Sequence, residues 1–536
     1  MELRPYQQAA REAVWNEWES GRQKTLLVLP TGCGKTVVFA KITEDAVRKG
    51  GKILILAHRS ELLEQAADKL EKTSGLKCAV EKAEQTCIGS WYRVCVGSVQ
   101  TLMRQKRLQQ FASDYFSTII IDEAHHATSD SYRIILDYFS DANVLGVTAT
   151  PDRGDQKNLG QIFDSLAYEY TLPQAIKEGY LTPIRALTVP VKIDMTHVGT
   201  NAGDYKPGDI ATALDPYLEQ IAQEMTKHCK DRKTVVFLPL VKTSQKFRDI
   251  LNQHGFSAAE VNGMSADREQ ILKDFADNKY NVLCNSMLLT EGWDCPDVDC
   301  VVVLRSTKVR ALYCQMVGRG TRLYPGKSHL LLLDFLWNTE KHELCRPACL
   351  ICEDADVQKK MTEQLEKNAG IPVDIEEAEN QASEDTVADR EAALASKLEQ
   401  MKKRKSKLVD PLQYEMSIQS QDLSSYVPAF SWEMQPPSDN QKKDLEKLGI
   451  NPDSVENAGK AEKILRTLAH RQMAGLATPK QIRRLEQYGF QHVGSWSFEA
   501  ANNMIQRIAY TGWKRVPPGI DPKTYQPEVN NAERTV

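Results

Sequence analysis

The sequence has no long apolar run, few cysteines for its length and little net charge, and each of these limits the possible classes of protein. No run of 18 apolar residues occurs, which excludes the long hydrophobic helix of a membrane span. The 12 cysteines are scattered through a long chain, which disfavours a small disulfide-stapled secreted domain. The formal net charge is only −4, so a nucleic-acid ligand would need a local basic track rather than a basic whole.

Length and composition indicate a globular protein of several domains. The chain has 536 residues, too many for a single hydrophobic core, and three or four domains are expected. Its 41% hydrophobic and 26% charged residues are ordinary for such a protein. The first stretch, MELRPYQQAAREAVW, lacks the basic-then-apolar pattern of a secretory signal. A cytoplasmic location with reduced thiols is therefore expected.

Residues 29–36 read LPTGCGKT, between an apolar strand at 25–29 and a helix that runs to about residue 49. This strand–loop–helix context is the one in which a glycine-rich loop cradles phosphates. Glycines let backbone amides approach the phosphates, Lys35 reaches the β and γ oxygens, and Thr36 ligates Mg²⁺. The loop residues predicted to hold ATP are Pro30, Thr31, Gly32, Cys33, Gly34, Lys35 and Thr36.

A second motif supplies carboxylates. The apolar strand at 117–121 runs directly into Asp122, Glu123, Ala124 and His125. Asp122 is predicted to hold Mg²⁺, and Glu123 to orient and deprotonate the attacking water. A further strand at 143–147 leads into TATP (148–151), whose small hydroxyl residues suit a link between the ATP site and a moving second domain.

From about residue 171 the chain crosses into a second alternation of strands and helices, which ends with a strand at 330–334. This pattern is doubly wound α/β without a phosphate loop of its own. Arg319 and Arg322 lie three residues apart at a predicted helix end, so both are expected to face a triphosphate across a cleft. Arginines delivered from a second lobe make hydrolysis depend on lobe closure.

Taken together, residues 1–340 resemble the core of the superfamily 2 DEAD/DEAH-box helicases. The matching segments, in order, are RPYQ (4–7), PTGCGKT (30–36), AHRSELLEQ (57–65), VGSVQTL (96–102), DEAH (122–125), TATP (148–151), TVVFLPLVKTS (234–244), LLTEGWDCP (288–296) and QMVGRGTR (315–322). The EGWD and RPYQ forms are similar to the branch that holds Rad3/XPB-type repair helicases, phage recombination helicases and restriction-enzyme motor subunits.

The resemblance implies further site residues. It assigns Arg4 and Gln7 to the adenine end, Gly292 and Asp294 to coupling between the lobes, and Gln315, with both arginines, to catalytic closure. The residues expected to contact the nucleic-acid backbone are Arg59, Ser98, Gln100, Thr101, Ser286 and Thr290. Unwinding relatives that carry a hairpin wedge place it between the segments holding Asp294 and Gln315. Here a strand and a helix fill that interval.

The expected fold is α/β, with two tandem RecA-like (P-loop NTPase) domains and a mostly α-helical C-terminal extension. The predicted divisions are 1–170, 171–340, a charged helical linker at 341–430, a helical module at 431–520 and a tail at 521–536. The module contains a repeat with a constant 40-residue offset, in which S-x-x-Q-x3-L-x3-G begins at Ser438 and T-x-x-Q-x3-L-x3-G at Thr478. Its basic face suits nucleic acid, and a protein partner is the alternative ligand. That face comprises Lys442, Lys443, Lys480, Arg483 and Arg484.

Two groups of cysteines raise the question of metal. The first is His342, Cys345, Cys349 and Cys352, whose spacing lacks the two separated ligand pairs usual in zinc sites. The second is Cys78, Cys87 and Cys95, in the part of the first lobe where iron–sulfur helicases insert a cluster. Three cysteines in a short insertion do not match a four-cysteine cluster. Small buried apolar residues are the favoured interpretation of both groups.

These observations predict an ATP-dependent DNA helicase or translocase that uses ATP and Mg²⁺ and acts on branched or duplex DNA. An RNA helicase is the alternative within the same class. A nucleic-acid-gated ATPase switch or loader, which binds without unwinding, is the alternative from another class. No membrane ligand is expected.

Overall fold

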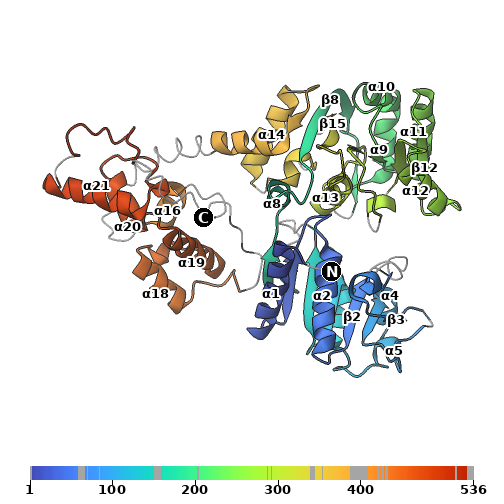
Figure 1. Cartoon of the computed structure of the whole chain (residues 1–536), viewed down its shortest axis with the longest axis horizontal. Helices are drawn as coiled ribbons and strands as arrows, with labels where there is room; N and C mark the ends of the chain where they lie inside the picture. The colour runs from blue at the N-terminus through green and yellow to red at the C-terminus, as the bar shows by residue number, and fades with distance from the viewer. Residues whose placement is uncertain are drawn as a thin grey trace. The chain divides into compact units, whose positions relative to one another are not determined.

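The structure is a computed structural model of the whole chain. It describes residues 3–57, 67, 68, 70–83, 85–149, 159–201, 204–286, 288–290, 293–338, 344–352, 354–386, 409–418, 423, 426, 428, 432–513 and 516–527. The chain divides into two compact units, Met1–Glu384 and Asp385–Val536. Figure 1 shows the larger unit as two α/β lobes, the first in blue and cyan and the second in green and yellow.

The first lobe is built on a seven-stranded sheet of order β3-β4-β2-β5-β6-β1-β7, in which all pairs are parallel. The strands are β1 (Lys24–Val28), β2 (Ile53–Ala57), β3 (Cys78–Glu81), β4 (Val94–Ser98), β5 (Thr118–Asp122), β6 (Asn143–Thr148) and β7 (Ser165–Glu169). The helices are α1 (Pro5–Glu19), α2 (Lys35–Arg48), α4 (Val99–Leu102), α5 (Gln105–Leu108), the short 3₁₀ helix η1 (Ala124–Thr128) and α6 (Asp130–Tyr138). Because parallel strands end at one edge, the loops after β1, β4 and β5 gather there.

The second lobe repeats this plan with the order β12-β13-β11-β14-β15-β8-β16, and β16 alone is antiparallel to its neighbour. Its strands are β8 (Ile184–Asp194), β11 (Thr234–Phe237), β12 (Ala258–Val261), β13 (Val282–Asn285), β14 (Cys300–Val303), β15 (Leu330–Asn338) and β16 (Val373–Asp374). A small ribbon, β9 (Thr200–Asn201) with β10 (Asp204–Tyr205), lies outside the sheet. The helices are α8 (Leu172–Lys177), α9 (Pro207–Leu214), η2 (Asp215–Tyr217), α10 (Leu218–His228), α11 (Val241–Gln253), α12 (Arg268–Ala276), η3 (Leu288–Thr290), α13 (Arg310–Val317) and η4 (Gly318–Gly320).

Two segments differ from the sequence-based expectation. The crossing expected after residue 171 consists of α8 and the long strand β8, which pairs with β15. Residues 344–384, expected to belong to a linker, instead continue the second lobe. There η5 (Pro347–Leu350) leads into α14 (Ala355–Lys367), and α14 buries Val357, Met361 and Leu365 against the lobe. The charged residues of α14 occupy its outer face, so its composition hid an amphipathic helix.

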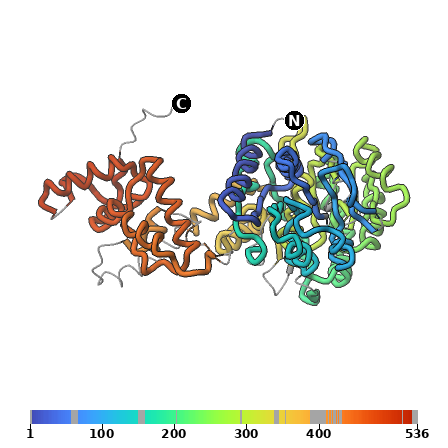
Figure 2. Tube along the Cα trace, turned by 90° about the horizontal axis from the view of Figure 1, so that it is seen from below, coloured from blue at the N-terminus to red at the C-terminus, as the bar shows by residue number. Residues whose placement is uncertain are grey.

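The C-terminal unit is helical, and Figure 2 draws it in orange to red. Its elements are α16 (Pro411–Ser417), α18 (Asp439–Leu448), η6 (Pro452–Ser454), α19 (Ala458–Met473), α20 (Pro479–Glu486), η7 (Val493–Ser495) and α21 (Phe498–Tyr510). The two 40-residue units share one local geometry. Gln441 Nε2 donates to Ala458 O at 3.1 Å, and Gln481 Nε2 donates to Phe498 O at 3.2 Å. Each glutamine ties the start of one helix to the start of the next.

Membrane spanning finds no support in the described residues, where every helix is too short or too polar to cross a bilayer.

Candidate nucleotide-hydrolysis site

The phosphate loop is shaped by two glycines with left-handed backbones. Gly32 has φ +93° and Gly34, the residue before α2, has φ +76°. A Cβ at Gly34 would lie 2.6 Å from Gln7 Nε2, so no other residue fits without displacing that side chain. The first amides of α2 have no helical partner, and a helix N-terminus favours an anion. The Thr31 hydroxyl beside them is buried with no hydrogen-bond partner among the described residues. This cradle fits a triphosphate.

The helix α1 attaches to the loop through the backbone of Cys33. Tyr6 Oη donates to Cys33 O at 2.9 Å, and Gln7 Nε2 donates to the same oxygen at 3.0 Å. Tyr6 stacks on Tyr170 with ring centroids 4.4 Å apart, and the Arg4 guanidinium lies 5.1 Å from the ring centroid of Tyr180. Of the two residues predicted to lie at the adenine end, Gln7 therefore contacts the phosphate loop directly, and Arg4 contacts Tyr6 and Tyr180. The role of Cys33 is carried by its carbonyl, and burial raises the pKa of its thiol to about 11.

The two carboxylates lie at the carboxyl end of β5, which is separated from β1 by β6 alone. Asp122 is the last residue of β5, and its Oδ1 accepts a hydrogen bond from Glu123 N at 3.0 Å. Glu123 has φ +53°, a left-handed conformation that costs a non-glycine residue energy and is concentrated at functional sites. Burial acts to raise the pKa of Glu123, but the charges of Lys35, His125 and Arg319 outweigh it and lower the pKa. Glu123 is therefore ionised at neutral pH.

Residues of the second lobe lie directly over this site. Gln315 Nε2, from α13, donates to Glu123 Oε2 at 3.2 Å. A Cβ built on Gly318 would lie 2.6 Å from the Cβ of Thr31, and one built on Gly32 would lie 3.5 Å from the Cγ of Arg322. The lobes thus contact each other both through the phosphate loop and through the Glu123 carboxylate.

Both arginines are positioned by the segment that holds Asp294. Arg319 donates to the carbonyl of Trp293 at 2.6 Å, and an Arg322 guanidinium nitrogen lies 2.6 Å from Asp294 Oδ1. Gly292, the other residue predicted for coupling, lies outside the described residues. The structure therefore joins the arginine segment (residues 319–322) to the Asp294 segment (residues 293–296) in one group within the second lobe.

Lys327 is a component of this group that the sequence did not reveal. Its ammonium donates to Gly320 O at 2.6 Å, Arg322 O at 2.9 Å and Pro296 O at 3.2 Å. It therefore links the carbonyls of the arginine segment to the segment after Asp294. Burial lowers the pKa of Lys327 to about 8.

Both lobes are similar to known proteins. Residues 1–153 match the family model "Type III restriction enzyme, res subunit", and residues 217–324 match "Helicase conserved C-terminal domain". The yeast protein "Putative ATP-dependent helicase IRC3" (Saccharomyces cerevisiae) is 31% identical over 66% of this chain and 54% of its own length. The chain thus spans about half of that relative. The "DNA 3'-5' translocase XPB2" of Sulfurisphaera tokodaii is 24% identical over 60% of this chain and 79% of its own length.

The chain belongs to the superfamily 2 helicases. Among solved structures, the ATP-dependent type ISP restriction-modification enzyme LlaBIII shares the fold, with a TM-score of 0.53 and 17% identity over 97% of this chain and 41% of that one. The α/β fold with two RecA-like lobes and a helical C-terminal region is confirmed.

The positions predicted to contact nucleic acid lie, where described, at or after the carboxyl ends of parallel strands. Ser98 ends β4, and Gln100 and Thr101 follow it in α4. Ser286 follows β13 and Thr290 ends η3. Ser98 Oγ donates to Gln100 Oε1 at 2.9 Å, and Thr101 Oγ1 accepts from Ala83 N at 3.2 Å. Arg59 lies outside the described residues.

The cysteines between β15 and β16 make separate contacts. Cys349 Sγ donates to Gln358 Oε1 at 3.8 Å, Cys352 Sγ lies 3.6 Å from the sulfur of Met361, and Cys345 is buried in the core. Across the described residues, these three do not form a group at metal-ligand spacing. His342 lies outside that part of the chain.

Proposed function

We propose that this superfamily 2 helicase is an ATP-dependent DNA translocase, in which closure of two lobes around ATP moves the chain along DNA. The observation that supports it most is the contact between Gln315 and Glu123, which joins the second lobe to the residue predicted to activate water. A hydrolytic site that is complete only when two lobes meet couples chemistry to lobe position.

The proposed chemistry assigns each side chain one task. Bound ATP with Mg²⁺ would supply the γ-phosphoryl group and the divalent charge that neutralises it. Lys35 and the amides at the start of α2 would hold the phosphates, and Thr36 and Asp122 would hold the metal. Glu123, kept ionised by the positive charges around it, would orient the attacking water and accept its proton.

The second lobe completes the site. Arg319 and Arg322 would stabilise charge that develops on the phosphoryl oxygens, and Gln315 would keep Glu123 aimed at the water. Separation of the lobes removes all three groups from the phosphate loop. Hydrolysis is then expected only in the closed arrangement, and product release in the open one.

DNA is the proposed track. The positions predicted to grip nucleic acid sit on both lobes, so closure would change the distance between two backbone grips. Contacts to phosphates give little sequence preference. The name of the XPB2 relative specifies DNA translocation, and this supports DNA over RNA here.

Translocation is proposed rather than strand separation for a specific reason. Between Asp294 and Gln315 the chain forms β14 and α13, with no hairpin in this described interval. A wedge at the position used by unwinding relatives is therefore lacking here. For the chain's division we propose motor domains at 1–170 and 171–384, the second extended by the packing of residues 344–384, and an accessory module at 431–520 that binds nucleic acid or a protein partner.

Comparison of ATPase rates tests the ligand. The wild-type protein is assayed with duplex DNA, forked DNA, single-stranded DNA and RNA, beside a Lys35→Ala control that should hydrolyse no ATP on any of them. Stimulation by duplex or forked DNA well above that by RNA supports the proposal. Stimulation by RNA alone would replace it with the RNA-helicase alternative.

A further inference from the structure

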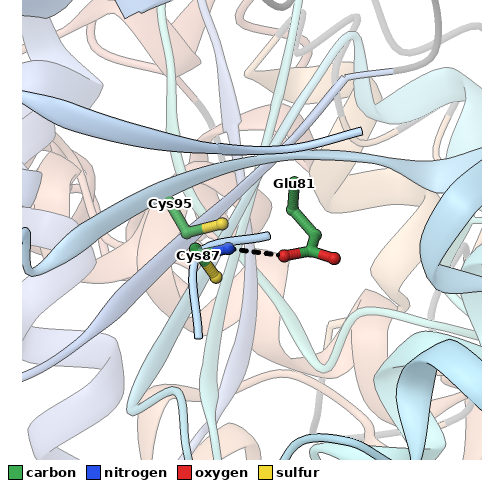
Figure 3. Close-up of side chains that lie close together, drawn as sticks. All are labelled: Glu81, Cys87 and Cys95. Carbon is green, nitrogen blue, oxygen red and sulfur yellow. Dashed lines mark hydrogen bonds between the residues drawn. The ribbon is translucent and has the colours of Figure 1, made fainter. Parts of the chain in front are cut away.

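We propose that Glu81, Cys87 and Cys95 form a binding site for a divalent metal ion of the zinc class. The three side chains come from the end of β3, the loop after it and β4, and Figure 3 shows them converging. One ligand atom from each lies within 4.8 Å of the other two. They are 0%, 3% and 3% exposed, so the group lies inside the lobe rather than on an acidic surface.

The strand register explains why the three meet. Ala79 pairs with Cys95 and Glu81 pairs with Gly97, so Glu81 and Cys95 lie diagonally on one face of the two strands. Gly97 opposite Glu81 has no side chain to separate them. The loop then turns back, and Cys87 N donates to Glu81 Oε2 at 2.8 Å. That bond holds the Cys87 backbone, and hence its thiol, beside the carboxylate.

Thiolate and carboxylate ligands suit a zinc-class ion. Zinc–sulfur bonds of about 2.3 Å at tetrahedral angles place two sulfurs about 3.8 Å apart. Ligand atoms already within 4.8 Å need only small side-chain rotations to reach that spacing. The three side chains provide three ligands, and a water molecule would provide the fourth.

The local charges also balance around a divalent ion. Arg107 Nε donates to Glu81 Oε1, so a guanidinium lies against the carboxylate on the side away from Cys87. Two thiolates and one carboxylate carry three negative charges. A divalent ion and Arg107 carry three positive charges. A neutral buried site is less costly than one with a net charge, and Arg107 is placed as an outer partner that orients a ligating carboxylate.

This site is distinct from the ATP site and from an iron–sulfur cluster. β3 is an edge strand of the sheet, and the four strands β4, β2, β5 and β6 separate it from β1, which leads into the phosphate loop. Cys78 stands three residues before Glu81 on β3, so strand alternation turns it to the other face, and its Sγ donates to Leu76 O at 3.8 Å. The third cysteine of the predicted group is thus replaced by Glu81.

Occupancy of the site would tie the loop at 82–93 to the sheet. That loop carries Trp91, which is 99% exposed, and Tyr92, which is 47% exposed. Its first residues contact Thr101, which is predicted to lie near nucleic acid. A bound ion would therefore rigidify an aromatic loop beside Thr101, one of the residues predicted to contact nucleic acid.

The test is a Co²⁺ titration of the full chain after treatment with a reductant and a chelator. Wild-type protein is expected to bind one equivalent with a thiolate-to-cobalt absorption band that Zn²⁺ displaces. Cys87→Ser and Cys95→Ser should each weaken binding at least about tenfold and shrink the band, and Glu81→Gln should weaken binding with the band retained. Cys78→Ser, a cysteine on the same strand but the other face, is the matched control and should bind as wild type does.

Thermal unfolding gives a second measurement. Added Zn²⁺ should raise the melting temperature of wild type and of Cys78→Ser, but not of the Cys87 or Cys95 variants. If a ligand variant fails to fold, the wild-type titration still decides. Absence of a cobalt band in reduced wild-type protein overturns the proposal. So does a band that persists unchanged in both cysteine variants, which would place the metal at other thiols, or one that disappears in Cys78→Ser.

Discussion

Replacement of Gly318 by alanine tests lobe closure with a single added carbon. Gly318 begins η4 with φ −60°, a conformation that alanine adopts readily, so the substitution should cause no backbone strain. The new Cβ would lie 2.6 Å from the Cβ and 3.0 Å from the Cγ2 of Thr31. Ordinary contacts between such carbons are about 3.5–4.0 Å. The lobes must therefore separate locally by about 1 Å.

Such a shift acts on the reacting groups, because Arg319 is the next residue and Gln315 lies one turn earlier. A misplacement of about 1 Å in a catalytic group costs about 10²-fold in rate. We expect Gly318→Ala to lower the kcat of DNA-stimulated ATP hydrolysis by about that factor. The free energy of unfolding should fall by up to about 3 kcal/mol, because overpacking of the contact with Thr31 outweighs the gain of up to about 1 kcal/mol from alanine as a helix residue.

Gly208→Ala is the matched control. Gly208 lies in α9, and a Cβ there would meet nothing within 4 Å. It should gain up to about 1 kcal/mol in stability with an unchanged kcat. Both variants are assayed for steady-state ATPase with saturating duplex DNA and for thermal unfolding. A Gly318→Ala enzyme with wild-type kcat would refute the argument that hydrolysis requires the contact between Gly318 and Thr31.

Three further changes give separate readouts. Lys35→Ala should lower ATPase by at least about 10²-fold while DNA binding, measured by fluorescence anisotropy, stays near wild type. Lys327→Met should lower kcat about tenfold. In wild type, kcat should fall as pH rises through about 8, where the Lys327 ammonium loses its proton, and the variant should lack this fall. The pKa of Lys327 in the folded chain lies below the ordinary 10.5, so the unfolded chain binds more protons between about pH 8 and pH 10.5. The contribution of Lys327 to the free energy of unfolding therefore rises with pH in this range, while activity falls. Arg346→Met should cost about 3–5 kcal/mol in urea unfolding, because Arg346 lies 2.7 Å from the buried carboxylate of Asp334.

The sequence revealed those parts of the site that depend on local chemistry. LPTGCGKT between a strand and a helix predicted the cradle, and the carboxylates after an apolar strand predicted Asp122 and Glu123. Such predictions are possible because a glycine-rich turn, a helix start and a strand end are set by neighbours in the chain. The arginines were found in the same way, through their spacing.

The features that the sequence did not predict depend on contacts between residues far apart in the chain. Lys327 follows an ordinary glycine turn, and nothing in its neighbours shows that its ammonium folds back onto three carbonyls. Glu81 was missed because a lone glutamate on a short strand has no metal signature until the register places it beside Cys95. β8 was mistaken for a crossing because Pro190 and exposed charges interrupt its alternation, and pairing along β15 overrides them.

The deletion of residues 431–536 separates motor from accessory module. The C-terminal unit has a buried core to which Val409, Tyr414 and Leu423 contribute beside residues of the module, so the deletion cuts into that core but should leave the motor folded. We expect ATPase activity to persist and DNA affinity or preference to change. Insoluble protein would show instead that the module is a structural part of the motor.

The proposed function requires movement along DNA rather than binding alone. A fluorescent third strand bound to a duplex reports it directly, because a translocase displaces that strand as it passes. With ATP, wild-type protein should release the triplex strand, and Lys35→Ala and Gly318→Ala should release it slowly or not at all. DNA-stimulated ATP hydrolysis without displacement would rule out translocation and identify the protein as a nucleic-acid-gated switch.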